Sequence, residues 1–249
     1  MDAVATPVQA PLEQLLHLAD NALVLGQRNA EWCGNGPVLE EDIALANMSL
    51  DLIGQARMLY QHAATVKGDG ATEDSLAYFR DAADFRNFTL LELPHASAAS
   101  ERDYAVTIVR NFLYSTFMLL QWEALQKSPD AQLAGIAGKS LKEVAYHFRH
   151  SRDWLIRLGD GTAESHDRTQ AALNQLLPYT AEFWNGEAPT LRVHWDELVN
   201  DALNEASLSR PPLLQAALPH GKAGQHSEHL APLLAEMQSL ARAHPAALW

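Results

Sequence analysis

The sequence LKEVAYHFRH, residues 141–150, carries a glutamate and two histidines at helical spacing. Glu143 and His147 stand one helical turn apart, and His150 follows one turn later. A carboxylate and an imidazole on one helix can be half of a metal site in a four-helix bundle. The same residues also suit the polar edge of a packed helix. The surrounding sequence has to distinguish these two interpretations.

The segment around this stretch is predicted to be a long helix. We expect it to cover about residues 130–158, because Ser128-Pro129 and Gly159-Asp160-Gly161 interrupt the pattern on either side. Apolar or small residues recur in it at steps of three and four, which is helical periodicity. Its expected core stripe is Leu141, Val144, Phe148, Ser151, Leu155 and Leu158.

The same periodicity predicts an all-α fold. Long helices are expected at about 11–30, 40–66 and 101–127, and further helices at about 72–82, 84–93, 162–185, 190–207 and 226–243. Together with the helix above, the long segments indicate a four-helix bundle. No linker rich in Gly, Ser or Pro divides the chain, so we expect one domain, residues 1–249. Its core bundle would cover about 11–160, with helices from about 161–249 packed on it.

The composition argues against several classes of function. The formal net charge of −13 argues against a nucleic acid partner, since phosphate backbones would be repelled. No run of about 18 apolar residues occurs, so no membrane span is expected. The N-terminal residues do not have the pattern of a secretory signal. Cys33 is the only cysteine, which excludes an internal disulfide and favours a cytoplasmic location.

A carboxylate-bridged diiron site requires a Glu from each of two helices and a Glu-x-x-His pair from each of the other two. In the helix expected at 40–66, the pair with this spacing in the middle of the inward face is Leu52 and Gln55. Neither is a good iron ligand. Asp51 points about 100° away from Leu52 and is expected to pair with an arginine such as Arg57 or with a neighbouring helix. The inward stripe is Leu45, Met48, Leu52, Gln55 and Leu59.

The other helices do not complete the site. In the helix at 130–158, the residue three positions before His147 is Val144, and Glu143 lies further round the helix. The helix at 101–127 has no Asp or Glu between Tyr104 and Trp122. Its expected inward stripe is Ala105, Ile108, Phe112, Ser115 and Leu119. The first helix offers Asp20 and Glu31, but one helix cannot make the site.

We therefore favour a structural role for the quoted stretch. Glu143 and His147 are expected to form a hydrogen-bonded pair one turn apart, and His150 to lie on the helix surface. In GQHSEHL, residues 224–230, His226 and His229 could bind zinc, but no third ligand is visible nearby. A helix start capped by Ser227 or a neighbour is favoured instead. Large aromatic residues are expected in the core, namely Trp122, Phe148, Trp154 and Phe183.

Three stretches resemble a known family. They are DNALVLGQRNAEWCGNGPVLEEDIALANMSLDLIGQARMLY (residues 20–60), KEVAYHFRHSRDWLIRLGDGT (142–162) and HSEHLAPLLAEMQ (226–238). These stretches are similar to the PaaC-type family, the C subunits of the bacterial phenylacetyl-CoA 1,2-epoxidase. The resemblance covers nearly the whole chain and is weaker around residues 94–103 and 185–215.

The resemblance implies a ferritin-like fold and a place in a multicomponent monooxygenase that converts phenylacetyl-CoA to its ring 1,2-epoxide. It assigns the diiron centre to a homologous catalytic protein, the A subunit, and NADPH, FAD and an iron–sulfur centre to a reductase subunit. The family's Glu-x-x-His motif maps onto Leu52–Gln55 and Val144–His147, where only His147 is retained. No cofactor, metal ligand or catalytic residue is therefore expected in this chain.

The leading hypothesis is a structural subunit that pairs with the catalytic A subunit and supports it. The alternative is a metal-dependent oxidase or hydrolase that uses His147, Glu143, Asp20, Asp51 or the His226/His229 pair. In a third possibility, basic residues on one helix, Lys139, Lys142 and Arg149, contact the phosphates of coenzyme A at a subunit interface. Such residues more often form a solvated face.

Overall fold

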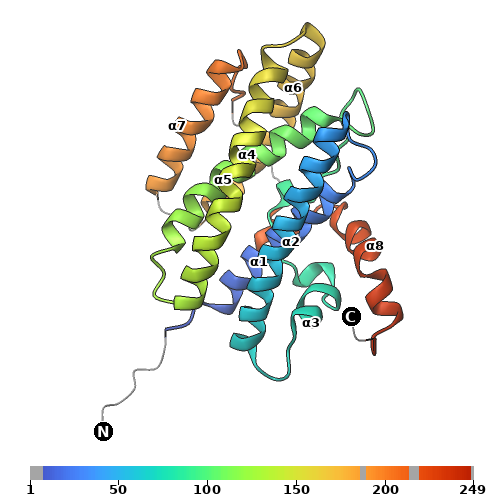
Figure 1. The fold of residues 1–249 in the computed structure, drawn as a ribbon, viewed down its shortest axis with the longest axis vertical. Coiled ribbons are helices and arrows are strands. Elements are labelled where there is room, and N and C mark those ends of the chain that lie inside the picture. The colour runs from blue at the N-terminus through green and yellow to red at the C-terminus, as the bar shows by residue number, and fades with distance from the viewer. Residues whose placement is uncertain (1–7, 186–188, 213–218, 248–249) are drawn as a thin grey trace.

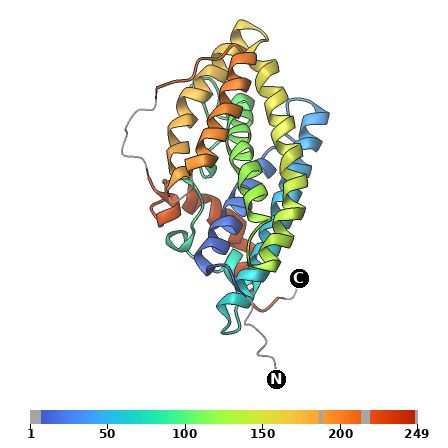
Figure 2. The ribbon, with the colours of Figure 1, turned by 90° about the vertical axis from the view of Figure 1, so that its left-hand side faces the viewer.

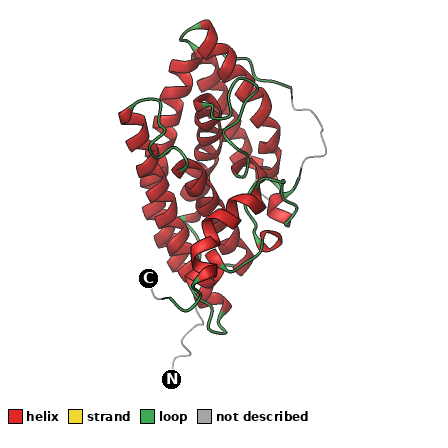
Figure 3. Cartoon of the chain, turned by 90° about the vertical axis from the view of Figure 1, so that its right-hand side faces the viewer, coloured by secondary structure: helices red, strands yellow, loops and turns green. Residues whose placement is uncertain are grey.

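The structure is a computed structural model that describes residues 8–185, 189–212 and 219–247. Within these ranges the regular secondary structure is helical and no strand occurs (Figure 3). This confirms the predicted all-α class. The α-helices are α1 (Leu12–Ala30), α2 (Leu39–Lys67), α3 (Glu73–Tyr78), α4 (Tyr104–Leu125), α5 (Ala131–Gly159), α6 (Ala163–Leu176), α7 (Pro189–Glu205) and α8 (Leu230–Ala243).

The four long helices form the bundle. Helix α1 packs along α2, α4 packs along α5, and α2 contacts α5 to join the two pairs (Figure 1). Their bounds agree with the predicted ones within three residues, because each helix ends at the breakers seen in the sequence. Helices α6 and α7 lie against α4 and α5 (Figure 2), and α8 packs on α3.

Helix α4 is buried on nearly all sides. Ile108, Phe112 and Ser115 of the predicted stripe are buried, but so are Val109, Leu113 and Phe117 on other faces. The reason is that α5, α6 and α7 pack around this helix, so its apolar residues need no single inward direction. The prediction of a single inward stripe for α4 therefore included too few of its buried residues.

The helix predicted over residues 84–93 is absent. The segment contains only two short 3₁₀ turns, η1 (Ala82–Asp84) and η2 (Thr89–Leu91). Its apolar residues are nevertheless buried: Phe85, Phe88, Leu90 and Leu91. Side chains from elsewhere replace the helical hydrogen bonds, since Phe88 N donates to Asn21 Oδ1 at 2.7 Å and Thr89 N donates to Glu182 Oε2 at 2.8 Å. The prediction was wrong because these acceptors lie far away in the sequence.

Three other predicted helices differ from the observed ones. The helix predicted over 72–82 ends at Tyr78. The helix predicted over 162–185 ends at Leu176 and continues as a 3₁₀ segment, η3 (Leu177–Trp184), which has a proline near its start. The helix predicted over 226–243 begins at Leu230. Across the described ranges, no helix combines the length and the apolar character that crossing a membrane requires.

Candidate functional site at the bundle centre and on the outer face of helix α2

The positions that match the family's ligand motif lie inside the bundle. Leu52 and Gln55 on α2 and Val144 and His147 on α5 are all buried. Leu52, Val144 and His147 line one cavity, together with Ser115 of α4. The cavity measures about 10 Å³, which is at the lower limit for a single water molecule. The centre is thus filled by the protein's own side chains.

His147 is held by the neighbouring helix. Its Nε2 lies 3.0 Å from Asp51 Oδ2, while Gln55 Nε2 donates to Glu143 Oε2 at 2.9 Å. The predicted Glu143–His147 pair was therefore wrong, and the expectation that Asp51 bonds to a neighbouring helix is confirmed. Helices α2 and α5 run antiparallel, and we call the line along which they meet the seam. His147 and Glu143 each bond to a residue of α2 that faces them across the seam, instead of to each other.

His150 also takes part in this seam. Its Nε2 lies 2.9 Å from Glu41 Oε2, and the Tyr104 hydroxyl donates to the same oxygen at 2.5 Å. Burial, followed by the hydrogen bond to Glu41, raises the pKa of Tyr104. The prediction that His150 lies on the helix surface was wrong, because its acceptor is 109 residues away and cannot be seen in the local sequence.

The residues at the centre do not fit a dinuclear iron site. Leu52 and Val144 have no donor atom, and Gln55 offers only a neutral amide. His147 is the one imidazole among the mapped positions, and Asp51 already bonds to its Nε2. In the part of the chain that the structure describes, no three His, Cys, Asp or Glu side chains gather closely enough to hold a metal ion. The donor set thus lacks both the carboxylates and the geometry that two irons require.

Asp20, one of the alternative acids, is fully buried and bonded on both oxygens. Tyr60 donates to Oδ1 at 2.5 Å, the backbone N–H of Arg86 donates to Oδ2 at 2.8 Å, and the Arg80 guanidinium pairs with the carboxylate. Burial and the negative charge of Asp20 raise the pKa of Tyr60. These contacts join α1, α2 and the segment after α3, so Asp20 has a structural role.

His226 and His229, which were considered as a zinc-binding pair, contact different groups. His226 Nδ1 lies 2.5 Å from Glu92 Oε1, and its Nε2 lies 2.9 Å from Phe85 O, to which it donates. Burial lowers the pKa of His226, but the hydrogen bond and charge of Glu92 outweigh burial, so the net shift is upward. The Ser227 hydroxyl donates to Glu92 Oε2 at 2.6 Å, and no side chain caps α8 at His229, so the capping prediction was wrong.

A second buried cluster surrounds His95, which sequence reasoning did not single out. His95 Nε2 donates to Arg28 O at 2.7 Å, so its Nδ1 acts as acceptor. Thr107, Arg110 and Trp32 donate to this nitrogen at 2.6, 2.9 and 3.3 Å. Burial and the charge of Arg110 lower the pKa of His95 to about 2, so the imidazole is neutral. Trp32 belongs to the string EWCG, residues 31–34, so the tryptophan of this string is a packed core residue.

The remaining candidates are peripheral. Glu31 accepts from Arg28 Nη1 at 2.7 Å at the end of α1, and Cys33 is exposed. Lys139 lies 4.0 Å from Glu143 on its own helix and is 61% exposed at the side chain. Lys142 and Arg149 lie on the same helix at partly or fully exposed positions. These three cations form the solvated face that was favoured for them.

The outer face of α2 exposes large apolar side chains. Leu39, Ile43, Leu50 and Ile53 are 71%, 52%, 65% and 41% exposed. Steps of four, seven and three residues place them on one side of the helix, opposite the inward stripe. We refer to these four residues as the α2 stripe. Its signal is present in the sequence, since Ile43, Leu50 and Ile53 are apolar residues that the inward stripe of α2 cannot accommodate.

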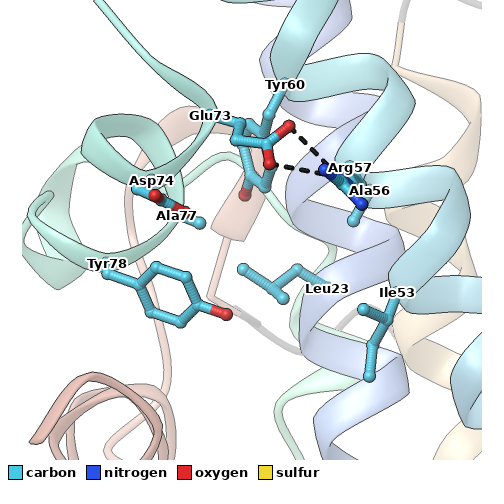
Figure 4. A pocket seen from close by; sticks show the side chains of 9 residues that line it. All are labelled: Leu23, Ile53, Ala56, Arg57, Tyr60, Glu73, Asp74, Ala77 and Tyr78. Atoms are coloured by element: carbon cyan, nitrogen blue, oxygen red, sulfur yellow. Dashed lines mark hydrogen bonds and ion pairs between the residues drawn. The ribbon is translucent and has the colours of Figure 1, made fainter. Parts of the chain in front are cut away.

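A shallow pocket adjoins one end of the α2 stripe. It has a volume of about 100 Å³ and lies between α1, α2 and α3, with Leu23, Ile53 and Tyr78 among its walls (Figure 4). Arg57 Nε donates to both carboxylate oxygens of Glu73, at 3.1 and 3.4 Å, across its rim (Figure 4). An apolar pocket with a charged rim, continuous with an apolar stripe, is the usual form of a protein contact surface.

The chain is similar to known proteins over nearly its whole length. The family model described as phenylacetic acid catabolic protein matches residues 2–249. The chain is 43% identical over 248 residues to the C subunit of the 1,2-phenylacetyl-CoA epoxidase of Escherichia coli (strain K12). That alignment covers 94% of this chain and 97% of the relative.

Proposed function

Because the chain belongs to the family of phenylacetic acid catabolic proteins, we propose that it is a structural subunit of a phenylacetyl-CoA epoxidase. In this role it carries no metal and performs no chemistry itself. It pairs with the homologous catalytic A subunit, which holds the diiron centre. A reductase subunit with FAD and an iron–sulfur centre supplies electrons from NADPH, and the whole complex works in the cytoplasm.

The composition of the bundle centre carries this proposal. Leu52 and Val144 stand where the family's motif has glutamates, and they line a cavity of about 10 Å³. Introducing iron there would require several carboxylates that the chain does not have. A bundle without ligands can fill its centre with apolar side chains, and its outer faces then remain available for assembly.

The α2 stripe is the surface that we assign to the catalytic partner. It is about 21 Å long, taking 1.5 Å per residue from Leu39 to Ile53. Together with the pocket of Figure 4 it extends from α2 to residues of α1 and α3. Specific interfaces bury about 800 Å² on each partner, and a few well-packed side chains near their centre supply most of the affinity.

Metal analysis tests the absence of a cofactor. The chain is purified after expression in iron-rich medium, alone and with the catalytic partner, and iron is measured per polypeptide. We expect a substoichiometric value for the chain alone, unchanged in His147→Ala, and iron that follows the partner in the complex. Stoichiometric iron in the chain alone that His147→Ala removes would overturn the proposal in favour of a metal-dependent oxidase.

A matched pair of variants tests the surface. Leu50→Arg places a charge in the middle of the α2 stripe, and we expect it to raise the Kd for the catalytic partner at least tenfold, about 1.4 kcal/mol. Val193→Arg is the control, since Val193 on α7 is 55% exposed and lies outside the stripe. Equal affinities of the two variants would refute the assignment of the α2 stripe, whereas no binding by the unaltered chain would refute the role itself.

A further inference from the structure

Three aromatic side chains from separate elements contact one another in series. Trp32 follows the end of α1, Tyr104 begins α4, and Trp154 lies in the last turns of α5. The Tyr104 ring contacts both others edge to face, with centroid distances of 5.7 Å to Trp32 and 5.6 Å to Trp154. Indole and phenol are the ring side chains that lose an electron most readily. Because Trp32 is buried and Trp154 is partly exposed, the three rings form a path for an electron between interior and surface.

The middle ring of this path has an acceptor for its proton. The Tyr104 hydroxyl donates to Glu41 Oε2 at 2.5 Å, and His150 Nε2 lies 2.9 Å from the same oxygen. Glu41 is 8% exposed, so the carboxylate that accepts this hydrogen bond is buried. Burial raises the pKa of Tyr104, so the phenol keeps its proton as long as the ring is not oxidised. A phenol that has lost an electron is a strong acid, and a hydrogen-bonded carboxylate is placed to take its proton.

The charges along the path favour oxidation at Tyr104 over oxidation at the two tryptophans. The guanidinium group of Arg102 lies 5.9 Å from the ring centroid of Trp32. The guanidinium group of Arg157 lies 5.5 Å from the ring centroid of Trp154. A cation over an aromatic ring is attracted to the neutral ring and repelled by a ring that has lost an electron. Tyr104 instead lies beside a carboxylate and becomes neutral once its proton has moved, so an electron vacancy is most stable there.

We propose that Tyr104 is a redox-active tyrosine that donates one electron, through the neighbouring tryptophans, to a strong one-electron oxidant such as an oxygen-derived radical. In this step the electron goes to the oxidant and the proton moves from Tyr104 Oη to Glu41 Oε2. The products are a neutral phenoxyl radical, a carboxylic acid and the reduced oxidant. A one-electron reductant such as ascorbate restores the phenol, and Glu41 returns the proton. This reaction is separate from the epoxidation that the proposed function leaves to the catalytic partner.

Cys33 allows an oxidant to be placed at one end of the path. It is the only cysteine of the chain, it is exposed, and it directly follows Trp32 in the sequence. A ruthenium–polypyridyl photosensitiser attached to this thiol is excited by a laser flash in the presence of a soluble electron acceptor, which leaves a Ru(III) oxidant beside Trp32. Transient absorption and freeze-quenched electron paramagnetic resonance then follow the radicals. We expect a tryptophanyl radical that decays as a tyrosyl radical forms.

Three variants of the labelled chain assign the radical. Tyr104→Phe keeps the ring and removes the hydroxyl, so we expect the tyrosyl signal to be lost and the tryptophanyl radical to persist. Glu41→Gln keeps an oxygen acceptor that is a much weaker base, and it should lower the tyrosyl yield by about tenfold or more. Tyr179→Phe is the control and should leave the yield unchanged. Tyr179 of η3 is also partly buried, but among the described residues it has no ring contact and no hydrogen-bonded carboxylate.

Three outcomes would contradict the proposal. A tyrosyl radical of equal yield in the unaltered chain and in Tyr104→Phe would overturn it, because another tyrosine would then be the electron donor. The absence of any tyrosyl radical in the unaltered chain would overturn it as well. An unchanged yield in Glu41→Gln would refute the transfer of the proton to Glu41. None of these measurements involves the catalytic partner, so a negative result would leave the proposed assembly unaffected.

Discussion

Charged side chains are buried to different extents at the bundle centre and around residues 80–95, a segment without an α-helix that we call the non-helical segment. At the centre, mostly apolar side chains line the cavity, and Asp51 and Glu143 beside it stay partly in solvent, with 37% and 21% of the side chain exposed. Around the non-helical segment, Asp20, Glu92 and Arg110 are fully buried. The bundle centre thus has apolar residues at Leu52 and Val144, while charged side chains elsewhere remain in the interior.

The difference shows what the buried charges do in this molecule. Each of them bonds to backbone groups of an irregular segment: Asp20 accepts from Arg86 N, Glu92 accepts from Ser227 N, and Arg110 donates to Leu93 O. Buried ionisable groups with shifted pKa values often mark active sites. In this molecule the buried charged side chains form hydrogen bonds with the backbone of irregular segments. Those segments need such partners because their N–H and C=O groups are not bonded within a helix.

The largest expected effect comes from comparing two aspartates, one in each region. Asp20→Asn leaves the buried Arg80 without its carboxylate, and we expect a loss of about 3–5 kcal/mol in the free energy of unfolding. Asp51→Asn, at the partly exposed seam, should cost less than about 1 kcal/mol. Urea unfolding followed by circular dichroism measures both. Similar losses for the two variants would contradict the contrast between the regions.

The next effect is a pH dependence that belongs to the buried cluster. Burial and the charge of Lys222 lower the pKa of His17 from 6.5 to about 3, and the pKa of His95 lies at about 2. Below pH 6.5 the unfolded chain therefore binds protons that the folded chain does not bind. Each histidine should lower the free energy of unfolding by about 1.4 kcal/mol per pH unit as pH falls from about 6 towards 3.

His17→Gln checks this dependence. The variant has no titrating group at this position, so the slope of the unfolding free energy between about pH 4 and 6 should decrease by about 1.4 kcal/mol per pH unit. An unaltered slope in His17→Gln would mean that His17 is protonated in the folded chain.

The smallest expected effect concerns the seam itself. A double-mutant cycle with His147→Gln and Asp51→Asn should give a coupling energy of about 0.2–1 kcal/mol, because solvent reaches Asp51 and screens the pair. Urea unfolding of the two single variants and the double variant provides the cycle. A coupling above about 2 kcal/mol would show that the centre depends on its polar contacts as strongly as the non-helical segment does.

The spacing of apolar residues was enough to predict the long helices and the buried face of α2. The long helices and the buried stripe of Leu45, Met48, Leu52, Gln55 and Leu59 follow from residue spacing alone. The stripe predicted for α4 was too narrow because α4 is enclosed by several helices, and the number of neighbours is not encoded within one helix.

The errors at His147, at His150 and over residues 84–93 share one physical cause, which is a partner distant in sequence. His150 bonds to Glu41 and His147 to Asp51 of another helix. Residues 84–93 have an apolar pattern compatible with a helix, but acceptors on Asn21 and Glu182 draw their N–H groups into another conformation. Glu92 was overlooked for the same reason, although an acid within the apolar run LLELP is a signal that it is buried and bonded.

The contact between Glu92 and His226 joins residues 134 positions apart, and it has a consequence for how the chain matures. During translation, residues 80–95 leave the ribosome long before their partners near residue 226 have been made. Glu92 and the buried apolar side chains of this segment therefore stay accessible to chaperones and proteases until residue 226 has been made. A chain truncated before residue 226 would leave the Glu92 carboxylate without His226 and the backbone N–H of Ser227 as partners.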